Sequence, residues 1–508
     1  MGKITVHEKA LAHLSRGLYR SPASAIRELI SNAWDANARI VRVDTNYPHF
    51  MRIAIQDNGD GFTREDFAQL MEGGVGNSQK RPRDLQLMKG RPVIGRLGIG
   101  MLGIAQICGA FTVTSTPRSG DGFKARVHLY DLIKERLDRD DAELVHDTEG
   151  GIEVDVGEYE FLPDYVPSSR PGTSVVADDV HPTFIRSFKE SVNHEQFKEP
   201  PIEWRKALGV VGKVHSINEL GDYWRLLWEL AAACPIPYLA KDALPQRVVE
   251  EEHEQLLQYD FQLIVDGMTL AKPVYLKGHH GGYTVRRLGP YRQTIYGKDL
   301  RFHGYIVVQE GEQLRPDELR GVLIRIKNVA IGYYDPSLLD YRYNQGPRSR
   351  WLTSEIFVEE GLEDALNVDR DSFNRFHPHF REIQAHFHRV LQDEIFPDVY
   401  KNIRVRSTAR REEKSVTRRS HLSNVISEGV DKRVKIRSDD GVADARIDVH
   451  STSMEVTVPS ATTLKVKKAN QELAQALLTI FELALQQRGR DAQRETFKRI
   501  LLDLLAKW

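Results

Sequence analysis

Four short segments in the first 180 residues constrain the fold most, because they combine polar residues and glycines in a fixed order. Their patterns are E-x-x-x-N-x-x-D-A from residue 28, D-x-G-x-G from residue 57, G-x-x-G-x-G from residue 95 and G-T at 172–173. The first lies in a predicted helix that begins after Ser21, where Pro22 suits the first helical position. The second and fourth adjoin predicted strands. We therefore expect helix, strand and loop residues to meet at one site.

The first segment places three polar side chains on one helical face. Glu28, Asn32 and Asp35 have the spacing i, i+4, i+7, which stacks side chains along one side of a helix. Asn32 can offer its side-chain oxygen to Mg²⁺, which prefers oxygen ligands. Glu28 can orient and deprotonate a water molecule. The same spacing also fits an amphipathic helix whose polar face meets solvent.

The second and fourth segments adjoin predicted strands and suit recognition of a base. Asp57 ends the strand-like run RIAIQD, where its carboxylate can accept a hydrogen bond from an exocyclic amine such as that of adenine. Gly59 and Gly61 let the backbone approach a flat ring closely. Thr173 can bind a phosphate or a water beside the base. The alternatives are a plain turn after Asp57 and an ordinary strand start at Thr173.

The third segment is a glycine cluster that leads into a short helix. Gly95, Gly98 and Gly100 can expose backbone N–H groups to phosphate at the helix N-terminus. A G-x-G-x-x-G pattern also begins at Gly98, but only two strand-like residues precede the cluster, so a dinucleotide-binding βαβ unit is not expected. A P-loop is excluded because no G-K-[ST] completes the pattern.

Together the four segments resemble the GHKL superfamily, which includes gyrase, Hsp-ninety-class chaperones, histidine kinases and MutL. The resemblance implies an α+β chain with a Bergerat fold at its N-terminus, in which helices pack on a mixed sheet and hold ATP and Mg²⁺. It implies that Glu28 is the general base and Asn32 the Mg²⁺ ligand. It further implies that Asp57 holds the adenine amine with Thr173 nearby, and that Asp35 faces the nucleotide.

The resemblance also indicates a branch of the superfamily. Residues 62–94 are polar and contain several glycines, which predicts one long loop. The resemblance implies that this loop is the ATP lid and that Gly98 and Gly100 cradle phosphate. Glu28 favours the hydrolase branch over the kinases, and two further runs are similar to bacterial chaperone-like and microrchidia-like ATPases. In the hydrolase branch a second domain sends a cation into the ATP site, and here Lys327 or Arg325 can reach the γ-phosphate.

Composition limits the partners and the compartment. The 71 Lys and Arg against 72 Asp and Glu give a net charge of −1, which excludes a uniformly basic binder of polyanions. The segment 401–422 is locally basic and can touch DNA phosphates. Two cysteines favour a reducing compartment. No secretory signal or membrane span is expected, so we predict a cytoplasmic protein without membrane contact.

The chain is expected to contain five parts. They are a GHKL ATP-binding domain (1–183) with its lid (62–94), a helical connector (184–255), an α/β transducer-like middle domain (256–400), a basic linker (401–422) and a small C-terminal domain (423–508). Residues 352–400 are expected to be helical, and the last domain should end in a helical hairpin that can dimerise the chain.

These features predict a Mg²⁺-dependent ATPase that works as an ATP-gated homodimeric clamp on DNA in bacterial repair or defence. Two alternatives stay open. One is a chaperone-like ATPase that acts on protein clients, and the other is a nucleotide-binding regulatory module without hydrolysis. A partner encoded in the same operon is also expected if further catalytic activity is needed.

Overall fold

The computed structural model describes most of the first 397 residues and a small part of the remainder. The described residues are 2–7, 22–72, 91, 103–104, 106–130, 145–148, 151–192, 203–239, 249–273, 283–309, 313–342, 349–367, 372–397, 417, 420, 433–439 and 446–459. The chain divides into two compact units, residues 1–391 and 392–508. The domain boundaries within the first unit stay a prediction.

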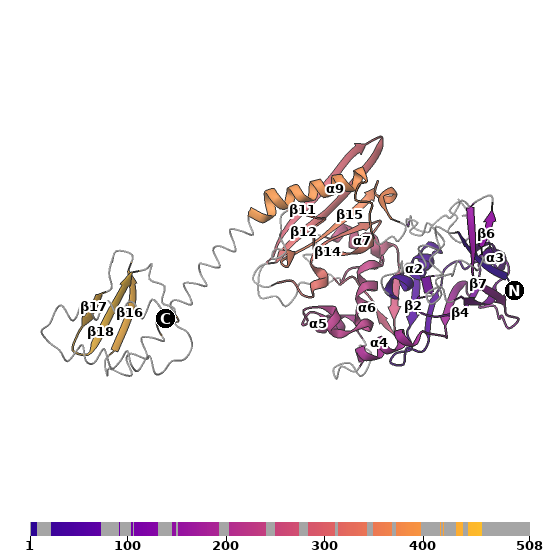
Figure 1. Ribbon diagram of the computed structural model, residues 1–508, viewed down its shortest axis with the longest axis horizontal. Helices are drawn as coiled ribbons and strands as arrows, with labels where there is room; N and C mark the ends of the chain where they lie inside the picture. The colour runs from indigo at the N-terminus through magenta and orange to yellow at the C-terminus, as the bar shows by residue number, and fades with distance from the viewer. Residues whose placement is uncertain are drawn as a thin grey trace. The chain divides into compact units, whose positions relative to one another are not determined.

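The N-terminal part of the first unit is built on a ten-stranded mixed sheet (Figure 1). Its order is β1-β7-β5-β4-β8-β3-β2-β9-β10, with β6 paired to β7. Its strands are antiparallel to their neighbours except for the parallel pair of β2 and β9. The strand bounds are β1 Gly2–His7, β2 Ile40–Asp44, β3 Ile53–Asp57, β4 Ala110–Thr116, β5 Phe123–Leu129, β6 Val145–Thr148, β7 Gly151–Phe161, β8 Gly172–Ala177, β9 Gln262–Val265 and β10 Met268–Thr269.

Helices pack on this sheet, and the expected α+β class is confirmed. Helix α2 contacts both β3 and α6, and α6 also contacts α4. Ile26, Ile30 and Trp34 of α2 are fully buried in the shared core. The helices are α2 Pro22–Asp35, α3 Arg64–Glu72, α4 Pro182–Val192, α5 Trp204–Val211, the 3-10 turn η6 Ile217–Leu220, α6 Asp222–Ala233 and α7 Glu250–Gln258.

Residues 62–94 were expected to form one long loop, and this is wrong for Arg64–Glu72, which form helix α3. Thr63 and Asp66 explain the helix start, because the Thr63 hydroxyl accepts the N–H of Asp66 while the Asp66 carboxylate accepts the N–H of Thr63. This is a capping box. Phe67 and Met71 then bury the inner face of the helix.

A second sheet of five strands follows in the same unit, in the order β11-β12-β15-β13-β14 (Figure 1). Helix α9 packs against β11. The pair of β13 and β15 is parallel, and the other pairs are antiparallel. The elements are β11 Tyr283–Ile295, β12 Lys298–Gln309, η8 Asp317–Leu319, β13 Gly321–Ile326, β14 Val329–Asp335, β15 Leu352–Glu360, η9 Glu363–Ala365 and α9 Pro378–Val390. The π-helical turn η10, Leu391–Ile395, begins at the last residue of this unit.

The expectation of helix throughout 352–400 is wrong for Leu352–Glu360, which form β15. This strand lies between β12 and β13, and its first seven residues are all buried. A strand that is covered on both faces lacks the alternation of polar and apolar residues that identifies strands from sequence. The adjoining helix α9 is correctly expected.

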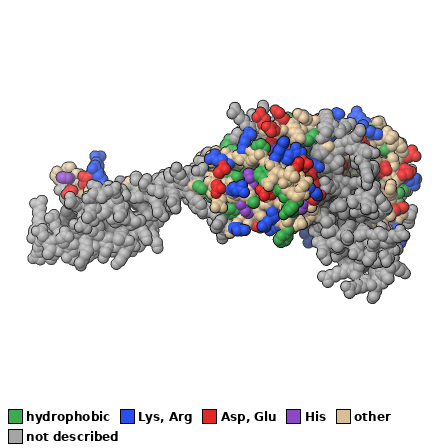
Figure 2. All heavy atoms as spheres, turned by 90° about the horizontal axis from the view of Figure 1, so that it is seen from above, with side chains coloured by type: hydrophobic (Ala, Val, Ile, Leu, Met, Phe, Trp, Pro, Cys, Tyr) green, Lys and Arg blue, Asp and Glu red, His purple; other side chains and the backbone are tan. Residues whose placement is uncertain are grey.

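The second unit contains a three-stranded sheet in the order β16-β18-β17, with bounds Arg433–Asp439, Ser453–Pro459 and Arg446–Val449. The predicted C-terminal helices, 467–487 and 491–507, lie outside the described residues. Among the helices that the structure describes, none is long and apolar enough to span a membrane. Lys or Arg side chains and Asp or Glu side chains are interspersed on the face shown in Figure 2.

Candidate nucleotide site

Helix α2 presents its three predicted polar residues in an unusual setting. Ten of its residues are buried. After Pro22, the residues that keep partial access to solvent are Glu28, Asn32 and Asp35. A solvent-facing amphipathic helix would leave such side chains fully exposed. Partial exposure within an otherwise buried helix is the pattern expected of side chains that line a recess.

Asp57 lies at the end of β3, where the protein holds its carboxylate in place. Its Oδ1 accepts the N–H of Gly59 at 2.8 Å, and the N–H of Thr173 on the neighbouring strand β8 also donates to the carboxylate. Burial raises the pKa of Asp57 to about 6, and the nearby charge of Asp60 raises it too, against the lowering effect of the two N–H groups. A carboxylate with so high a pKa at a strand end is typical of a functional position.

Two glycines of the motifs are required by close backbone approaches. Gly172 has φ of +151°, and a Cβ there would lie 2.2 Å from the carbonyl oxygen of Asp57. Gly61 has φ of +63°, and its Cβ would lie 2.3 Å from the carbonyl oxygen of Thr116. Any larger residue would push β8 or β4 away from the turn after Asp57. The two glycines therefore fix the position of the turn and of Thr173.

The turn after Asp57 is also bonded to the end of helix α2. The N–H of Asp60 donates to the carbonyl of Ala36 at 2.6 Å. The amide of Asn37 donates to Oδ2 of Asp60, also at 2.6 Å. Gly59 lies against the same end of α2, where a Cβ would approach the Ala36 oxygen to 2.5 Å. The first, second and fourth sequence segments are thus brought together by direct contacts.

The structure describes only some of the other predicted site residues. Gly95, Gly98 and Gly100 lie outside the described residues, as does most of the lid. Within the lid range, Arg91 is described and buried. Its guanidinium donates to the carbonyls of Ala38 at 2.6 Å and Tyr259 at 2.5 Å. It also lies over the Trp34 ring, 4.6 Å from its centroid. Sequence reasoning missed this anchor, because nothing in its polar surroundings distinguishes Arg91 from its neighbours.

The two candidate cations of the second sheet have different environments. Arg325 is buried and bonds Glu355 through two nitrogens, each at 2.9 Å. Lys327 stands in the turn between β13 and β14, with φ of +53°, and its ammonium lies 3.2 Å from Glu363. Arg325 is therefore committed to a fully buried pair, whereas the pair of Lys327 is partly exposed. The described ion-pair partners of Arg325 and Lys327 are thus glutamates that follow β14 in the chain, and not Asp57 of the candidate nucleotide site.

Comparison with known proteins identifies the class of the N-terminal domain. Residues 19–148 match the family model described as histidine kinase-, DNA gyrase B-, and HSP90-like ATPase. These residues are therefore a domain of the GHKL ATPase superfamily, as the four segments predict.

Individual relatives match shorter shares of the chain. A provisionally named type II restriction enzyme, HgiDII, from Herpetosiphon aurantiacus is 32% identical over 186 residues, covering 37% of this chain and 26% of that protein. The DNA mismatch repair protein MutL of Anoxybacillus flavithermus (strain DSM 21510 / WK1) is 33% identical over 118 residues, covering 23% of this chain and 19% of MutL. The chain thus matches about a quarter or less of the length of these relatives. The solved N-terminal domain of a DNA repair protein aligns with 77% of this chain and 98% of its own, with 14% identity and a TM-score of 0.38.

The pKa of Asp57 predicts how base binding depends on pH. Only the ionised carboxylate can accept two backbone N–H groups and still accept a hydrogen bond from an amine. We expect the affinity for adenosine to weaken as pH falls through about 6, the pKa of Asp57. Adenosine is the suitable ligand because it carries no phosphate that titrates in this range. Ligand-observed NMR between neutral and mildly acidic pH measures the effect, and a flat profile would contradict it.

Proposed function

We propose that the chain is a Mg²⁺-dependent ATPase that works as an ATP-gated homodimeric clamp on DNA. The carrying observation is the junction of α2, β3 and β8, where the partly buried carboxylate of Asp57 accepts the N–H of Thr173. The partly accessible side chains of α2 are the second support. Such a junction suits a ligand with an amino-substituted base at one end and a metal-bound polyphosphate at the other.

Each residue has a proposed role in that cycle. Asp57 accepts the adenine amine, and Asn32 supplies an oxygen ligand to Mg²⁺. Glu28 takes the proton from the attacking water. Lys327 releases Glu363 and approaches the γ-phosphate when the second sheet moves toward the nucleotide. Asp35, on the same face of α2, would face the nucleotide. Bound Mg²⁺ would neutralise part of the phosphate charge.

DNA is the proposed client because two relatives carry DNA-directed names, one for mismatch repair and one for restriction. The basic segment 401–422 offers six arginines for phosphate contacts, namely Arg404, Arg406, Arg410, Arg411, Arg418 and Arg419. Closure would join two protomers, and the helices predicted for the C-terminus would hold them together between cycles. The two cysteines, Cys108 and Cys234, are buried free thiols, which suits the proposed cytoplasmic location.

Replacing Glu28 by alanine is expected to separate binding from turnover. Loss of a general base lowers the hydrolysis rate by about 100- to 10,000-fold, while Asp57 and Asn32 still hold the nucleotide. Steady-state phosphate release measures turnover, and a fluorescent ATP analogue measures binding. Glu190→Ala, an exposed glutamate on α4, is the matched control and should retain full turnover. Normal turnover in Glu28→Ala would assign the base to another residue.

The same assay with added macromolecules tests the client. Duplex DNA should stimulate the full-length protein, and the stimulation should fall steeply as salt rises, because phosphate contacts release counterions. Stimulation by an unfolded protein instead of DNA would favour a chaperone-like clamp. Nucleotide binding without any turnover, with or without DNA, would leave the regulatory module as the function.

A further inference from the structure

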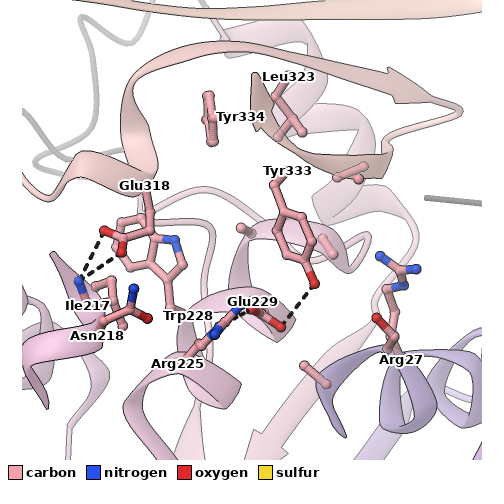
Figure 3. A pocket seen from close by; sticks show the side chains of 16 residues that line it. Arg27, Ile217, Asn218, Arg225, Trp228, Glu229, Glu318, Leu323, Tyr333 and Tyr334 are labelled. Atoms are coloured by element: carbon pink, nitrogen blue, oxygen red, sulfur yellow. Dashed lines mark hydrogen bonds and ion pairs between the residues drawn. The ribbon is translucent and has the colours of Figure 1, made fainter. Parts of the chain in front are cut away.

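A cavity of about 180 Å³, whose lining includes none of the nucleotide-motif residues, lies between the helices of the first unit and its second sheet. Helix α2 contributes its N-terminal turns, α6 forms one wall, and β13 with β14 forms the opposite wall (Figure 3). This volume slightly exceeds that of an engineered cavity known to hold benzene. It therefore suits a ligand with a single ring.

The walls of the cavity are largely apolar and partly aromatic. Trp228 and Leu323 are buried. The Tyr333 side chain projects from β14 into the cavity, toward α6 (Figure 3). Four alanines from α2, α6 and β14 also line the cavity, namely Ala23, Ala232, Ala233 and Ala330. Flat aromatic side chains beside small ones leave a slot in which a planar ring can stack.

The polar groups of the cavity favour an anion over a cation. Both carboxylates at its edge already accept hydrogen bonds. Glu318 accepts the N–H of Ile217 at 3.0 Å and the Ser216 hydroxyl at 2.6 Å. Glu229 accepts Nε of Arg225 at 2.8 Å and the Tyr333 hydroxyl at 3.2 Å. A cation would have to compete with these donors for the carboxylate oxygens.

Arg225, in contrast, has more donors than its described partner uses. The Arg225 guanidinium carries five N–H groups, and its described hydrogen bond to a side chain uses only Nε. Its side chain is 46% exposed at the cavity mouth, so its terminal nitrogens can turn toward a ligand. Arg27 brings a second guanidinium to the lining from α2 (Figure 3). Guanidinium groups bind carboxylates through paired hydrogen bonds.

We propose that this cavity is a binding site for a small aromatic anion, with its ring between Tyr333 and Trp228 and its charged group on Arg225. The bound ligand would touch α2, α6 and β14 at once. Because Arg27 directly precedes Glu28 on α2, the ligand would also act as an effector of nucleotide turnover. That last step rests on the proposed function, whereas binding itself does not.

Three probes of one shape and different charge test the site. Benzoate, benzamide and benzamidine carry the same ring with a negative, a neutral and a positive group. Saturation-transfer NMR on the full-length protein without nucleotide should give benzoate a Kd of about 1 mM or tighter, within the per-atom ceiling for so small a ligand. Benzoate should bind about 10-fold more tightly than benzamide, as one charge-assisted contact predicts. Benzamidine should bind more weakly than either.

A matched pair of variants tests whether benzoate binds at Arg225 in this cavity. Arg225→Gln should remove the preference for benzoate and leave benzamide binding unchanged. Arg186→Gln, an exposed arginine on α4, should behave as the wild type. Tyr333→Leu should weaken all three probes, which tests the ring slot independently of charge. Saturating ADP should not displace benzoate.

Three results would overturn the proposal. They are no binding of benzoate, equal binding of the three probes, and a preference for benzoate that persists in Arg225→Gln. Displacement by ADP would also overturn it, because the anion would then occupy the nucleotide site. If benzoate binds as expected but does not change the ATPase rate, the site stands and only its coupling to Glu28 fails.

Discussion

Asp57→Asn is expected to weaken the binding of adenine nucleotides by about 10- to 100-fold. One hydrogen bond to a charged group contributes about 1.5–3 kcal/mol, and each 1.4 kcal/mol is a factor of ten in affinity. Asparagine keeps one oxygen for the N–H of Gly59, which Asp57 accepts at 2.8 Å. Its NH₂ group cannot accept from the adenine amine, and it would also meet the N–H of Thr173. Isothermal titration calorimetry with ADP measures the loss.

A matched variant separates loss of the base contact from loss of the fold. Asp178→Asn removes a carboxylate just beyond the other end of β8, where the Asp178 side chain is 46% exposed and lies 3.5 Å from Arg52. This variant should bind ADP as the wild type does. Thermal melting of both proteins should show that Asp57→Asn stays folded at the assay temperature. Unchanged affinity in folded Asp57→Asn would move the adenine pocket to another part of the domain.

The sequence predicts the local framework of this site well, because short-range patterns determine it. Pro22 starts α2, and apolar residues at helical spacing bury it. The strand-like run before Asp57 forms β3, and Gly61 in the turn after it has a positive φ that few other residues adopt. These signals lie within a few residues of the structures they specify. The roles assigned to Glu28, Asn32 and Asp57 stay predictions.

Long-range pairing is what the sequence does not reveal. Strands β9 and β10 fall in the range expected for the middle domain, yet β9 pairs with β2, more than 200 residues earlier. Arg91 makes a similar long-range contact, because its guanidinium in the lid range donates to the carbonyl of Tyr259, 168 residues later. Such contacts depend on the packing of complete elements and leave no periodic pattern behind. The sequence does not identify the buried strand β15 for a related reason, because both of its faces are covered and its polar and apolar residues do not alternate.

Glu355→Ala is expected to destabilise the protein by about 3–5 kcal/mol, the range for breaking a buried ion pair from one side. Glu355 and Arg325 are 0% and 1% exposed, and Tyr238 and Tyr334 each donate a hydroxyl to the carboxylate at 2.6 Å. Nζ of the buried Lys272 donates to the carbonyl of Cys234 at 2.6 Å. The pKa of Lys272 is lowered by burial and by Arg325, and the charge of Glu355 opposes that shift. Removing the Glu355 carboxylate would therefore leave Arg325 as an unpaired buried charge beside Lys272.

The same strand supplies the control for this prediction. Glu360 pairs with Arg301, and both side chains are at least 40% exposed, so Glu360→Ala should cost no more than about 1 kcal/mol. Urea unfolding of both variants compares the two losses, and equal losses would show that Glu355 does not balance buried charge.

The pKa of Glu355 gives an independent measure of the same pair. Burial raises this pKa, but the charge and hydrogen bonds of Arg325 and the two tyrosine hydroxyls outweigh that effect and lower it from 4.5 to about 2. The stabilisation is therefore fully present above pH 4.5, the unfolded value, and is lost as pH falls toward 2. Glu355→Ala should lose this part of the acid dependence, whereas Glu360→Ala should retain it.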